Sequence, residues 1–291
     1  MNNSQTPDIL KKIKNQKLKI AVAVEGGGLR GLVSASMLDC LKDHGLAEQV
    51  QSISGTSAGA INASYFLSNQ MQDLFKLYKK MATSDFIQPL KFPNAMNLDF
   101  LFNDQIPNHH PVDFDPIRNH EKFFITVSDI EDGQSKAISS QLTNHPDDFL
   151  QLLRASCSAP LYTTNTEKIH GRTYNDGHIG LAIPYQPHLE TDVDYILCLM
   201  TQKKSYRKKQ NLFSKFHQLL ALRQYSADFR QRFANSYDLY NAHIEVIFAH
   251  PKIVPVQIEE DDIIISKMCR NPEEVDQCRL SVKKRIETYF N

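Results

Sequence analysis

Two glycine-rich stretches near the start of the chain decide how the sequence is expected to fold: EGGGLRG at residues 25–31 and GTSAG at residues 55–59. Each follows a short apolar run, at residues 18–24 and 50–54, and each precedes a stretch with helical character. Apolar, β-branched runs that stop at glycine are typical of buried parallel strands. Because consecutive strand–turn–helix units place their turns at the same edge of a parallel sheet, we expect the two turns to lie close together.

The second stretch places Ser57 at the centre of a Gly-x-Ser-x-Gly pentapeptide. A serine in this pattern sits on a sharp, strained turn that requires small neighbours, here Gly55 and Gly59. The helix expected at residues 58–67 points the positive end of its dipole at the serine and favours negative charge there. Taken alone, the pattern fits a helix-capping turn as well as it fits a nucleophile.

The first stretch predicts an anion site, because it offers free backbone N–H groups and a helix that begins near Leu29. Gly26, Gly28 and Gly31 also match a dinucleotide-binding fingerprint, which calls for an acidic residue about 20 residues further on. Here the second strand runs into the serine turn instead, and no phosphate-loop lysine follows. An oxyanion hole beside a nucleophile accounts for both turns, whereas a nucleotide-binding module accounts for one.

With YNDG at residues 174–177, the two turns resemble the motifs of the patatin-like phospholipase family. The stretch ASCSAP at residues 155–160 resembles the Ala-Ser-x-x-x-Pro segment of that family, and the whole resemblance covers residues 20 to about 184. It implies a serine lipid acyl hydrolase that uses a Ser–Asp dyad without a histidine. The implied substrates are carboxylic esters of phospholipids or lysophospholipids, cleaved through an acyl-enzyme without a cofactor or a metal.

The resemblance also implies roles for individual residues. Ser57 is the implied nucleophile, and Asp176, followed by Gly177, is its base. The implied oxyanion-hole donors are Gly26, Gly27 and Gly28. Arg30 matches the basic position of the family's glycine motif. The chain departs from the family at His178, where glycine or alanine is usual.

His178 has two interpretations. In an extended segment its side chain would share a face with that of Asp176, because side chains two residues apart point the same way. In a turn, which we favour, it would point to solvent. Two further functions stay open: a Ser–His–acid esterase of another substrate class, using one of the eleven histidines, and a lipid-binding protein whose dyad is spoiled by His178.

The composition limits the classes of function. Lys+Arg and Asp+Glu number 33 each, so no net charge attracts the chain to nucleic acid. No run of about 18 apolar residues predicts a transmembrane segment. Five scattered cysteines without a Cys-x-x-Cys pair indicate reduced thiols and a cytoplasmic location. No His and Cys spacing indicates a metal site. For a lipid hydrolase with these properties, we expect any contact with a membrane to be peripheral.

The chain is expected to form a polar tail or short surface helix at residues 1–17, followed by a single domain at residues 18–291. This domain is predicted to be a three-layer α/β/α sandwich with a mainly parallel central sheet, in which the part after about residue 184 completes the sheet and its helical cover. The predicted helices span residues 31–44, 58–67, 71–81, 147–155, 211–239 and 272–290. Beyond the first two strands, the predicted strands lie at residues 123–128, 136–141, 193–200, 244–248 and 253–256, with a further hairpin within 162–174.

Two segments carry two interpretations each. Residues 86–110 are expected to form an ordered loop on the core; the alternative is a flexible apolar rim over an acyl-chain entrance, formed by Phe92, Met96, Leu98, Phe100, Leu101 and Phe102. A basic run follows the strand at 193–200. We favour a solvated surface for it; the alternative is a patch for anionic headgroups. Its members are Lys203, Lys204, Arg207, Lys208, Lys209 and Lys215, with Phe213 and Phe216 among them.

Overall fold

The computed structural model describes residues 5–209 and 222–291, and the strands in this part form one mixed sheet of eight strands. The strands are β1 (Ile20–Val24), β2 (Val50–Thr56), β3 (Phe123–Asp129), β4 (Ser135–Ser139), β5 (Glu167–Ile169), β6 (Arg172–Asp176), β7 (Tyr195–Lys203) and β8 (Ile253–Ile258). Their order is β5-β6-β3-β2-β1-β7-β8, and β4 pairs with β3 outside this path. The five strands from β8 to β3 are parallel, whereas β4, β5 and β6 pair antiparallel with their neighbours.

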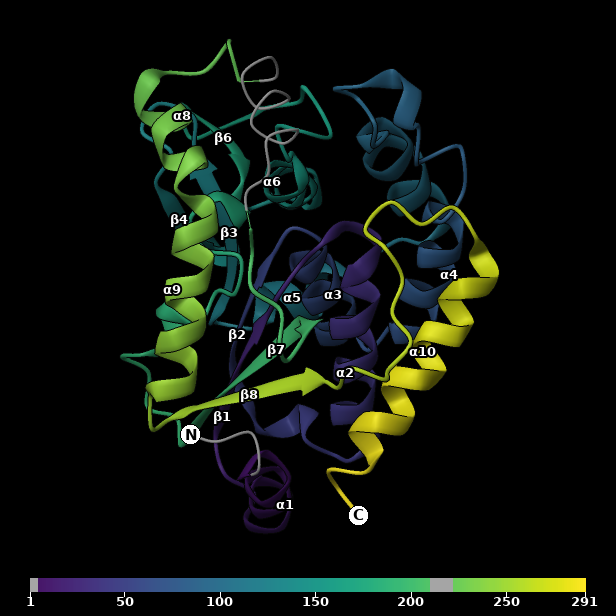
Figure 1. The fold of residues 1–291 in the computed structure, drawn as a ribbon, viewed down its shortest axis with the longest axis vertical. Helices are drawn as coiled ribbons and strands as arrows, with labels where there is room; N and C mark the ends of the chain where they lie inside the picture. Colours follow the sequence, from purple (N-terminus) through teal and green to yellow (C-terminus); the bar gives the residue numbers. More distant parts are fainter. Residues whose placement is uncertain (1–4, 210–221) are drawn as a thin grey trace.

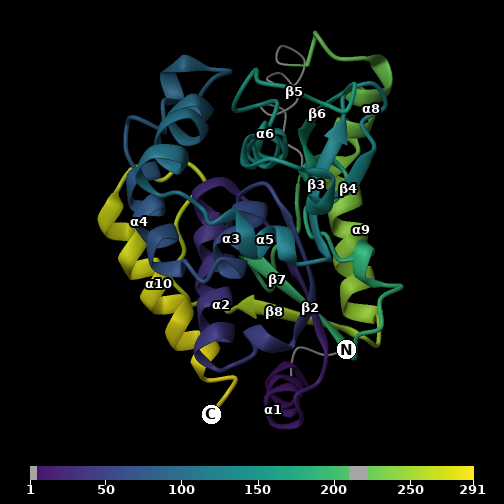
Figure 2. The same cartoon turned by 180° about the vertical axis from the view of Figure 1, so that it is seen from behind.

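Helices lie on both sides of this sheet. The α-helices of the described part are α1 (Thr6–Gln16), α2 (Leu32–Asp43), α3 (Ala58–Leu67), α4 (Met71–Met81), α5 (Phe114–Asn119), α6 (Pro146–Cys157), α8 (Ala227–Ala234), α9 (Ser236–Ala249) and α10 (Pro272–Glu287). Figure 1 shows α8 and α9 along one side of the molecule and α4 and α10 along the other. The reverse view in Figure 2 shows the same division, with the strands between the two groups.

The burial pattern of β1 explains this layering. Val22 and Val24 point into the main core, which also contains the apolar faces of α2, α3, α4, α6 and α10. Ala21 and Ala23 point the other way, into a second core that includes Ile244 of α9. Every residue of β1 is buried, and its sequence is therefore an unbroken run of apolar residues. The predicted three-layer α/β/α sandwich with a mainly parallel sheet is therefore confirmed.

Several local predictions are confirmed as well. The helices α3 and α4 occupy the predicted residues 58–67 and 71–81. Both predicted hairpins form, as β3–β4 and as β5–β6. The second hairpin turns at His170 and Gly171, which have φ angles of 48° and 82°.

The strand predicted at residues 244–248 is wrong, because these residues belong to α9. Ile244 and Ile247 are buried three positions apart on one side of the helix, whereas Val246 is 43% exposed. The β-branched residues of this run resemble a strand locally, but the helix buries two of its three aliphatic side chains against the sheet.

The loop interpretation of residues 86–110 is wrong at its C-terminal end, where Phe100–His109 form a π-helix, η5. Most of the proposed rim belongs to the core, since Met96, Leu98, Leu101 and Phe102 are buried. Phe92, in contrast, is 42% exposed. Packing on the core, the interpretation that we favoured for this segment, therefore describes most of its apolar side chains.

The predicted N-terminal tail and part of the predicted long helix at 211–239 have described structure. Within residues 1–17, α1 buries Leu10 and Ile13 in the main core. The long helix predicted at 211–239 begins outside the described residues, as do Phe213, Lys215 and Phe216 of the basic run. Its described part is divided between α8 and the start of α9. Among residues 5–209 and 222–291, no helix has both the length and the apolar character needed to cross a bilayer.

Candidate active site

Ser57 occupies a strained turn between β2 and α3. Its φ and ψ angles are 56° and −130°, a region that residues with a side chain rarely adopt. The turn is possible because its neighbours are glycines: a Cβ on Gly59 would lie 2.2 Å from the carbonyl oxygen of Val24. The structure thus gives Ser57 the sharp bend that the Gly-x-Ser-x-Gly pattern predicts, with α3 beginning at the next residue.

The ASCSAP stretch at residues 155–160 supports this turn through Ser156. The backbone N–H of Ser57 donates a hydrogen bond of 2.8 Å to Oγ of Ser156. The Ser156 hydroxyl in turn donates a bond of 2.7 Å to the carbonyl oxygen of Thr126 on β3. Ser156 is buried at the end of α6, so this chain of two bonds connects the strained turn to the sheet.

The strand register brings Asp176 to the same edge of the sheet. Thr56, just before the serine, pairs with Thr126 on β3, and Asp176 pairs with the next residue of β3, Val127. Strand β6 runs antiparallel, so the carboxylate arrives from the opposite chain direction. Ser57 and Asp176 line one pocket with a cavity volume of about 100 Å³, and Asp176 is 2% exposed.

Gly177 follows Asp176 and lies tightly against the sheet, where a Cβ would approach the carbonyl oxygen of Thr126 to 2.5 Å. It begins a short 3₁₀-helix, Gly177–Ile179, that Asp176 caps. The backbone N–H of His178 donates to Oδ1 of Asp176 at 2.9 Å, and Nδ1 of its ring lies 3.2 Å from the same oxygen. His178 is therefore in a turn, as we favoured, but its ring faces the carboxylate and lines the pocket.

The glycine turn at residues 26–28 forms a further part of the pocket wall. A Cβ on Gly26 would lie 2.2 Å from the carbonyl oxygen of Thr56 and 2.9 Å from Cβ of Ser57, so the two turns are in contact. Gly27 and Gly28 have φ angles of 141° and 58°. Within the described residues, no acceptor faces the N–H groups of Gly26 and Gly27. These N–H groups are therefore available to an oxygen atom bound beside Ser57.

Arg30 lies under the glycine turn within a buried polar network. Its Nε donates to Oγ1 of Thr201 at 3.4 Å, and the Thr201 hydroxyl donates to the carbonyl oxygen of Gly26 at 3.0 Å. The Thr201 N–H and the Tyr240 hydroxyl donate to the two carboxylate oxygens of Glu25, at 2.6 and 3.0 Å. This network fixes the backbone of the turn. Glu25, Thr201 and Tyr240 were not assigned to the site by sequence analysis, and of these only Glu25 lies within a quoted motif.

Cys157 is a further pocket residue that sequence reasoning did not assign to the site, although it lies within the quoted stretch at 155–160. Its thiol is buried beside the Ser57 side chain. Burial raises the pKa of the thiol well above its usual value, and the nearby Asp176 carboxylate acts in the same direction. The thiol therefore stays protonated and neutral next to the serine.

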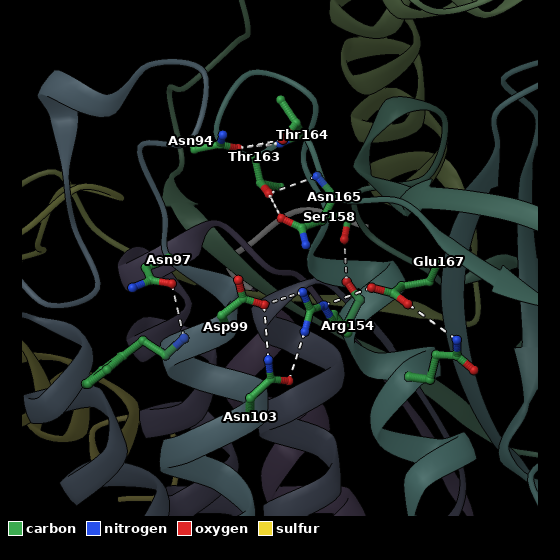
Figure 3. A network of polar contacts seen from close by, with 12 residues as sticks. Asn94, Asn97, Asp99, Asn103, Arg154, Ser158, Thr163, Thr164, Asn165 and Glu167 are labelled. Carbon is green, nitrogen blue, oxygen red and sulfur yellow. Dashed lines mark hydrogen bonds and ion pairs between the residues drawn. The ribbon is translucent and has the colours of Figure 1, made fainter.

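A second network holds the segment before η5 against α6 (Figure 3). Arg154 forms ion pairs with Asp99 at 2.6 Å and Glu167 at 2.8 Å, and donates to Asn103 at 3.0 Å. Figure 3 shows the guanidinium between Asp99 and Asn103 on one side and Glu167 on the other. Because Ser156 and Cys157 follow Arg154 in the last turn of α6, this network anchors the helix that supports the serine turn.

The histidines are relevant to the triad alternative. His178 is the histidine that lines the Ser57 pocket in the described part of the chain, and no hydrogen bond joins it to Ser57 there. His188 is fully buried beside different serines: its Nδ1 lies 2.8 Å from Oγ of Ser52, and its Nε2 lies 2.7 Å from Oγ of Ser54. His188 thus connects β2 to the segment before β7.

The fold and pocket define a class of α/β proteins in which a serine at a strand–helix turn faces both a glycine-rich turn and a buried carboxylate. Comparison with known proteins gives the family. Residues 22–187 match the family model described as patatin-like phospholipase, and the chain belongs to this family.

Individual relatives are more distant. The chain is 29% identical over 174 residues to the uncharacterized protein YjjU of Escherichia coli (strain K12), which covers 57% of this chain. The match spans 47% of YjjU, about half of that protein's length. Among solved structures, VipD from Legionella pneumophila superposes with a TM-score of 0.47 at 12% identity, over 92% of this chain and 67% of VipD.

Proposed function

We propose that this chain is a serine lipid acyl hydrolase that cleaves carboxylic esters of phospholipids or lysophospholipids. The observation that carries the proposal is the convergence of Ser57, Asp176 and the glycine turn on one pocket. We infer the substrate class from the family and the type of reaction from the residues that line the pocket. This combination favours ester hydrolysis over nucleotide binding, because both glycine-rich turns then have a role.

The reaction has two halves. Oγ of Ser57 attacks the ester carbonyl carbon while Asp176 accepts the hydroxyl proton, and the proton then passes to the departing alcohol oxygen. The products of this half are an acyl-serine ester and a free alcohol. In the second half, Asp176 takes a proton from water, the hydroxide attacks the acyl carbon, and the proton returns to Oγ of Ser57 as the carboxylic acid leaves.

The negative charge of each tetrahedral intermediate is stabilised by the backbone N–H groups at Gly26, Gly27 and Gly28. One such donor commonly contributes ~3 kcal/mol to transition-state stabilisation. The N-terminus of α3, which begins directly after Ser57, adds its dipole to the same region. His178 holds the Asp176 carboxylate in position through the two contacts to Oδ1.

The direct test is labelling with a fluorophosphonate, followed by mass-spectrometric mapping of the modified serine. We expect the label on Ser57 and loss of hydrolysis of phosphatidylcholine and lysophosphatidylcholine in Ser57→Ala. Ser158→Ala is a matched control, because among the described residues its hydroxyl bonds only to the carbonyl oxygen of Arg154 in α6. Labelling at another serine, or full activity in Ser57→Ala, would refute the proposal.

We further infer that the protein works in the cytoplasm and contacts a lipid surface peripherally. All five cysteines lie in the described residues and are free, which supports a reducing compartment. Leu90 is fully exposed and Phe92 is 42% exposed, on the segment that leads to the pocket residue Met96. The backbone N–H of Met96 donates a hydrogen bond of 2.9 Å to the carbonyl oxygen of Tyr162, which holds Met96 in place. Leu90 and Phe92 are therefore close in sequence to a pocket residue whose position is fixed.

Vesicle co-sedimentation tests this contact. We expect Leu90→Asp to reduce binding to phosphatidylcholine vesicles, because a carboxylate cannot enter the apolar layer. Leu280→Asp is the matched control, since Leu280 is 67% exposed on α10, which contributes no residue to the Ser57 pocket. Equal binding of the two variants would refute a contact through Leu90.

A further inference from the structure

Three cationic side chains from distant parts of the sequence line the Ser57 pocket. Arg30 follows the glycine turn, Lys208 follows β7, and Lys267 lies between β8 and α10. The two lysines lie outside residues 22–187, the part that matches the family model. The pocket thus includes side chains from beyond the matched part of the chain.

Lys208 is held in place by α9. Its backbone N–H donates to Oδ1 of Asn241 at 2.9 Å, and its carbonyl accepts from Nδ2 of the same side chain at 3.0 Å. The ammonium group lies 4.3 Å from the centre of the Tyr240 ring, a favourable cation–π distance. The position of Lys208 is thus fixed at both its backbone and its side chain.

Lys267 is held against the glycine turn. Its carbonyl accepts a hydrogen bond of 3.2 Å from the N–H of Leu29, and a Cβ on Gly28 would lie 2.8 Å from the same carbonyl oxygen. Its ammonium group lies 5.3 Å from the centre of the Tyr162 ring, another pocket residue. Both lysines therefore rest on aromatic rings beside the place where the substrate ester would bind.

The charges of these lysines are not neutralised by the protein. Neighbouring cations of the basic run are paired, Lys204 with Glu259 and Arg207 with Glu245. Within the described residues, Lys208 and Lys267 form no ion pair, and every Asp and Glu of the sequence lies in this part of the chain.

The two carboxylates nearest the pocket are already engaged. Glu25 accepts from Thr201 and Tyr240, and Asp176 accepts from His178. The pKa of Lys208 is lowered to about 8, first by burial and then by the positive charges of Lys267 and Arg30, against the opposing effect of the Glu25 and Asp176 carboxylates. A group of neighbouring, partly desolvated cations is stabilised when a ligand brings an anion to it.

We propose that Lys208 and Lys267 form an anion subsite that binds a phosphoryl group of the substrate whose ester lies at Ser57. This inference rests on the proposed function and makes it more specific. The enzyme then prefers esters that carry a phosphate close to the scissile bond over neutral esters with the same acyl chain. Arg30 adds positive charge from beneath the glycine turn.

The test compares two substrates with one acyl chain, a lysophosphatidic acid and the corresponding monoacylglycerol. The quantity measured is the ratio of kcat/KM for the phosphorylated ester to kcat/KM for the neutral ester. We expect Lys208→Met and Lys267→Met each to lower this ratio by about tenfold or more, because each substitution removes a charged contact to the phosphate. Lys208→Arg should retain most of the ratio. Lys204→Met is the matched control, because Lys204 belongs to the same basic run but does not line the pocket. An unchanged ratio in Lys208→Met would overturn the subsite.

A binding measurement separates failure of the subsite from failure of the proposed function. Lysophosphatidic acid should bind to Ser57→Ala, and the double variant with Lys208→Met should bind it about tenfold more weakly. This result supports the subsite even if the wild type hydrolyses neither ester, and equal binding overturns it. Inorganic phosphate as a competitor of lysophosphatidic acid identifies the source of the anion. If phosphate competes and Lys208→Met abolishes this competition, the subsite accepts any phosphoryl group. If Lys208→Met lowers the ratio of kcat/KM values but phosphate does not compete, the subsite requires a lipid-bound phosphate.

Discussion

Nδ1 of His178 lies 3.2 Å from Oδ1 of Asp176, while the backbone N–H of the same histidine donates to the same oxygen at 2.9 Å. The imidazole contact resembles that of the acid in a Ser–His–acid triad, where Nδ1 also faces the carboxylate. In this chain, however, no hydrogen bond joins the His178 ring to Ser57 within the described residues. We therefore propose a positioning role for His178 beside the proposed Ser57–Asp176 dyad.

His178→Ala tests this role. The substitution removes the ring and keeps the backbone bond to Asp176, so we expect kcat to fall by only about five- to tenfold, the effect of one hydrogen bond. The measurement is kcat on a lysophospholipid, with phosphonate labelling of Ser57 as a second readout. A loss of about 10⁴-fold with an intact fold would make His178 the base and establish a triad.

Asp176→Asn should have the larger effect. The amide cannot accept the serine proton, so we expect kcat to fall by about 10⁴-fold while the fold remains intact. Asp129→Asn is a suitable control: Asp129 is another buried aspartate, paired with Lys136 and Arg172 at 2.8 Å each. The Asp129→Asn substitution should mainly lower the free energy of unfolding and should have only a small effect on kcat. Similar kcat values for the two variants would argue against Asp176 as the base.

Ser156→Ala tests the support of the serine turn. It leaves the N–H of Ser57 and the carbonyl of Thr126 without their shared hydroxyl partner, which costs about 1–3 kcal/mol per buried unsatisfied group. We expect a lower free energy of unfolding in urea and a lower kcat. If the stability and kcat of Ser156→Ala match those of Ser158→Ala, the proposed support is absent.

His188 should make the fold sensitive to acid. Burial lowers its pKa to about 3, whereas an unfolded histidine has a pKa near 6.5. The unfolded chain therefore binds more protons between these values, and the free energy of unfolding falls as the pH drops below about 6, by about 1.4 kcal/mol per pH unit. His188→Asn retains a donor and an acceptor but does not titrate. Urea unfolding at pH 7, 6 and 5 should show a smaller decrease for this variant; identical decreases would exclude His188 as the cause.

The preference for a phosphorylated ester should decrease at alkaline pH. The pKa of Lys208 is about 8, lowered first by burial, so its positive charge is present below this pH and is lost above it. The charged groups that act on it are Glu25, Arg30, Asp176 and Lys267. We expect the ratio of kcat/KM values, phosphorylated over neutral, to fall between pH 7 and 9 in the wild type. The Lys208→Met variant should show a smaller change, and an equal change would place the titrating group elsewhere.

The turns at Ser57 and at residues 26–28 could be predicted because they depend on local rules, whereas Asp176 was indicated only by the resemblance to the family motifs. Glycine patterns indicate where the backbone bends, and parallel strands place their turns at one edge. Lys208 was noted only as a member of the basic run, and its place in the Ser57 pocket could not be predicted, because it depends on Asn241, 33 residues further along the chain. The wrong strand at 244–248 has a similar cause. Its local β-propensity is real, but burial of Ile244 and Ile247 against the second core decides in favour of a helix.

The pairing of β6 with β3 also sets a tolerance for insertions and deletions. Because side chains alternate across a strand, one residue added within β6 before Asp176 would move the carboxylate to the other face of the sheet and bring Asn175 toward the pocket side. Residues added at the tip of the hairpin, beyond His170, leave this alternation unchanged, and Gly171 there has open space around it. Length variation among related sequences should therefore accumulate at the tip, and the same position offers an attachment point for a reporter peptide.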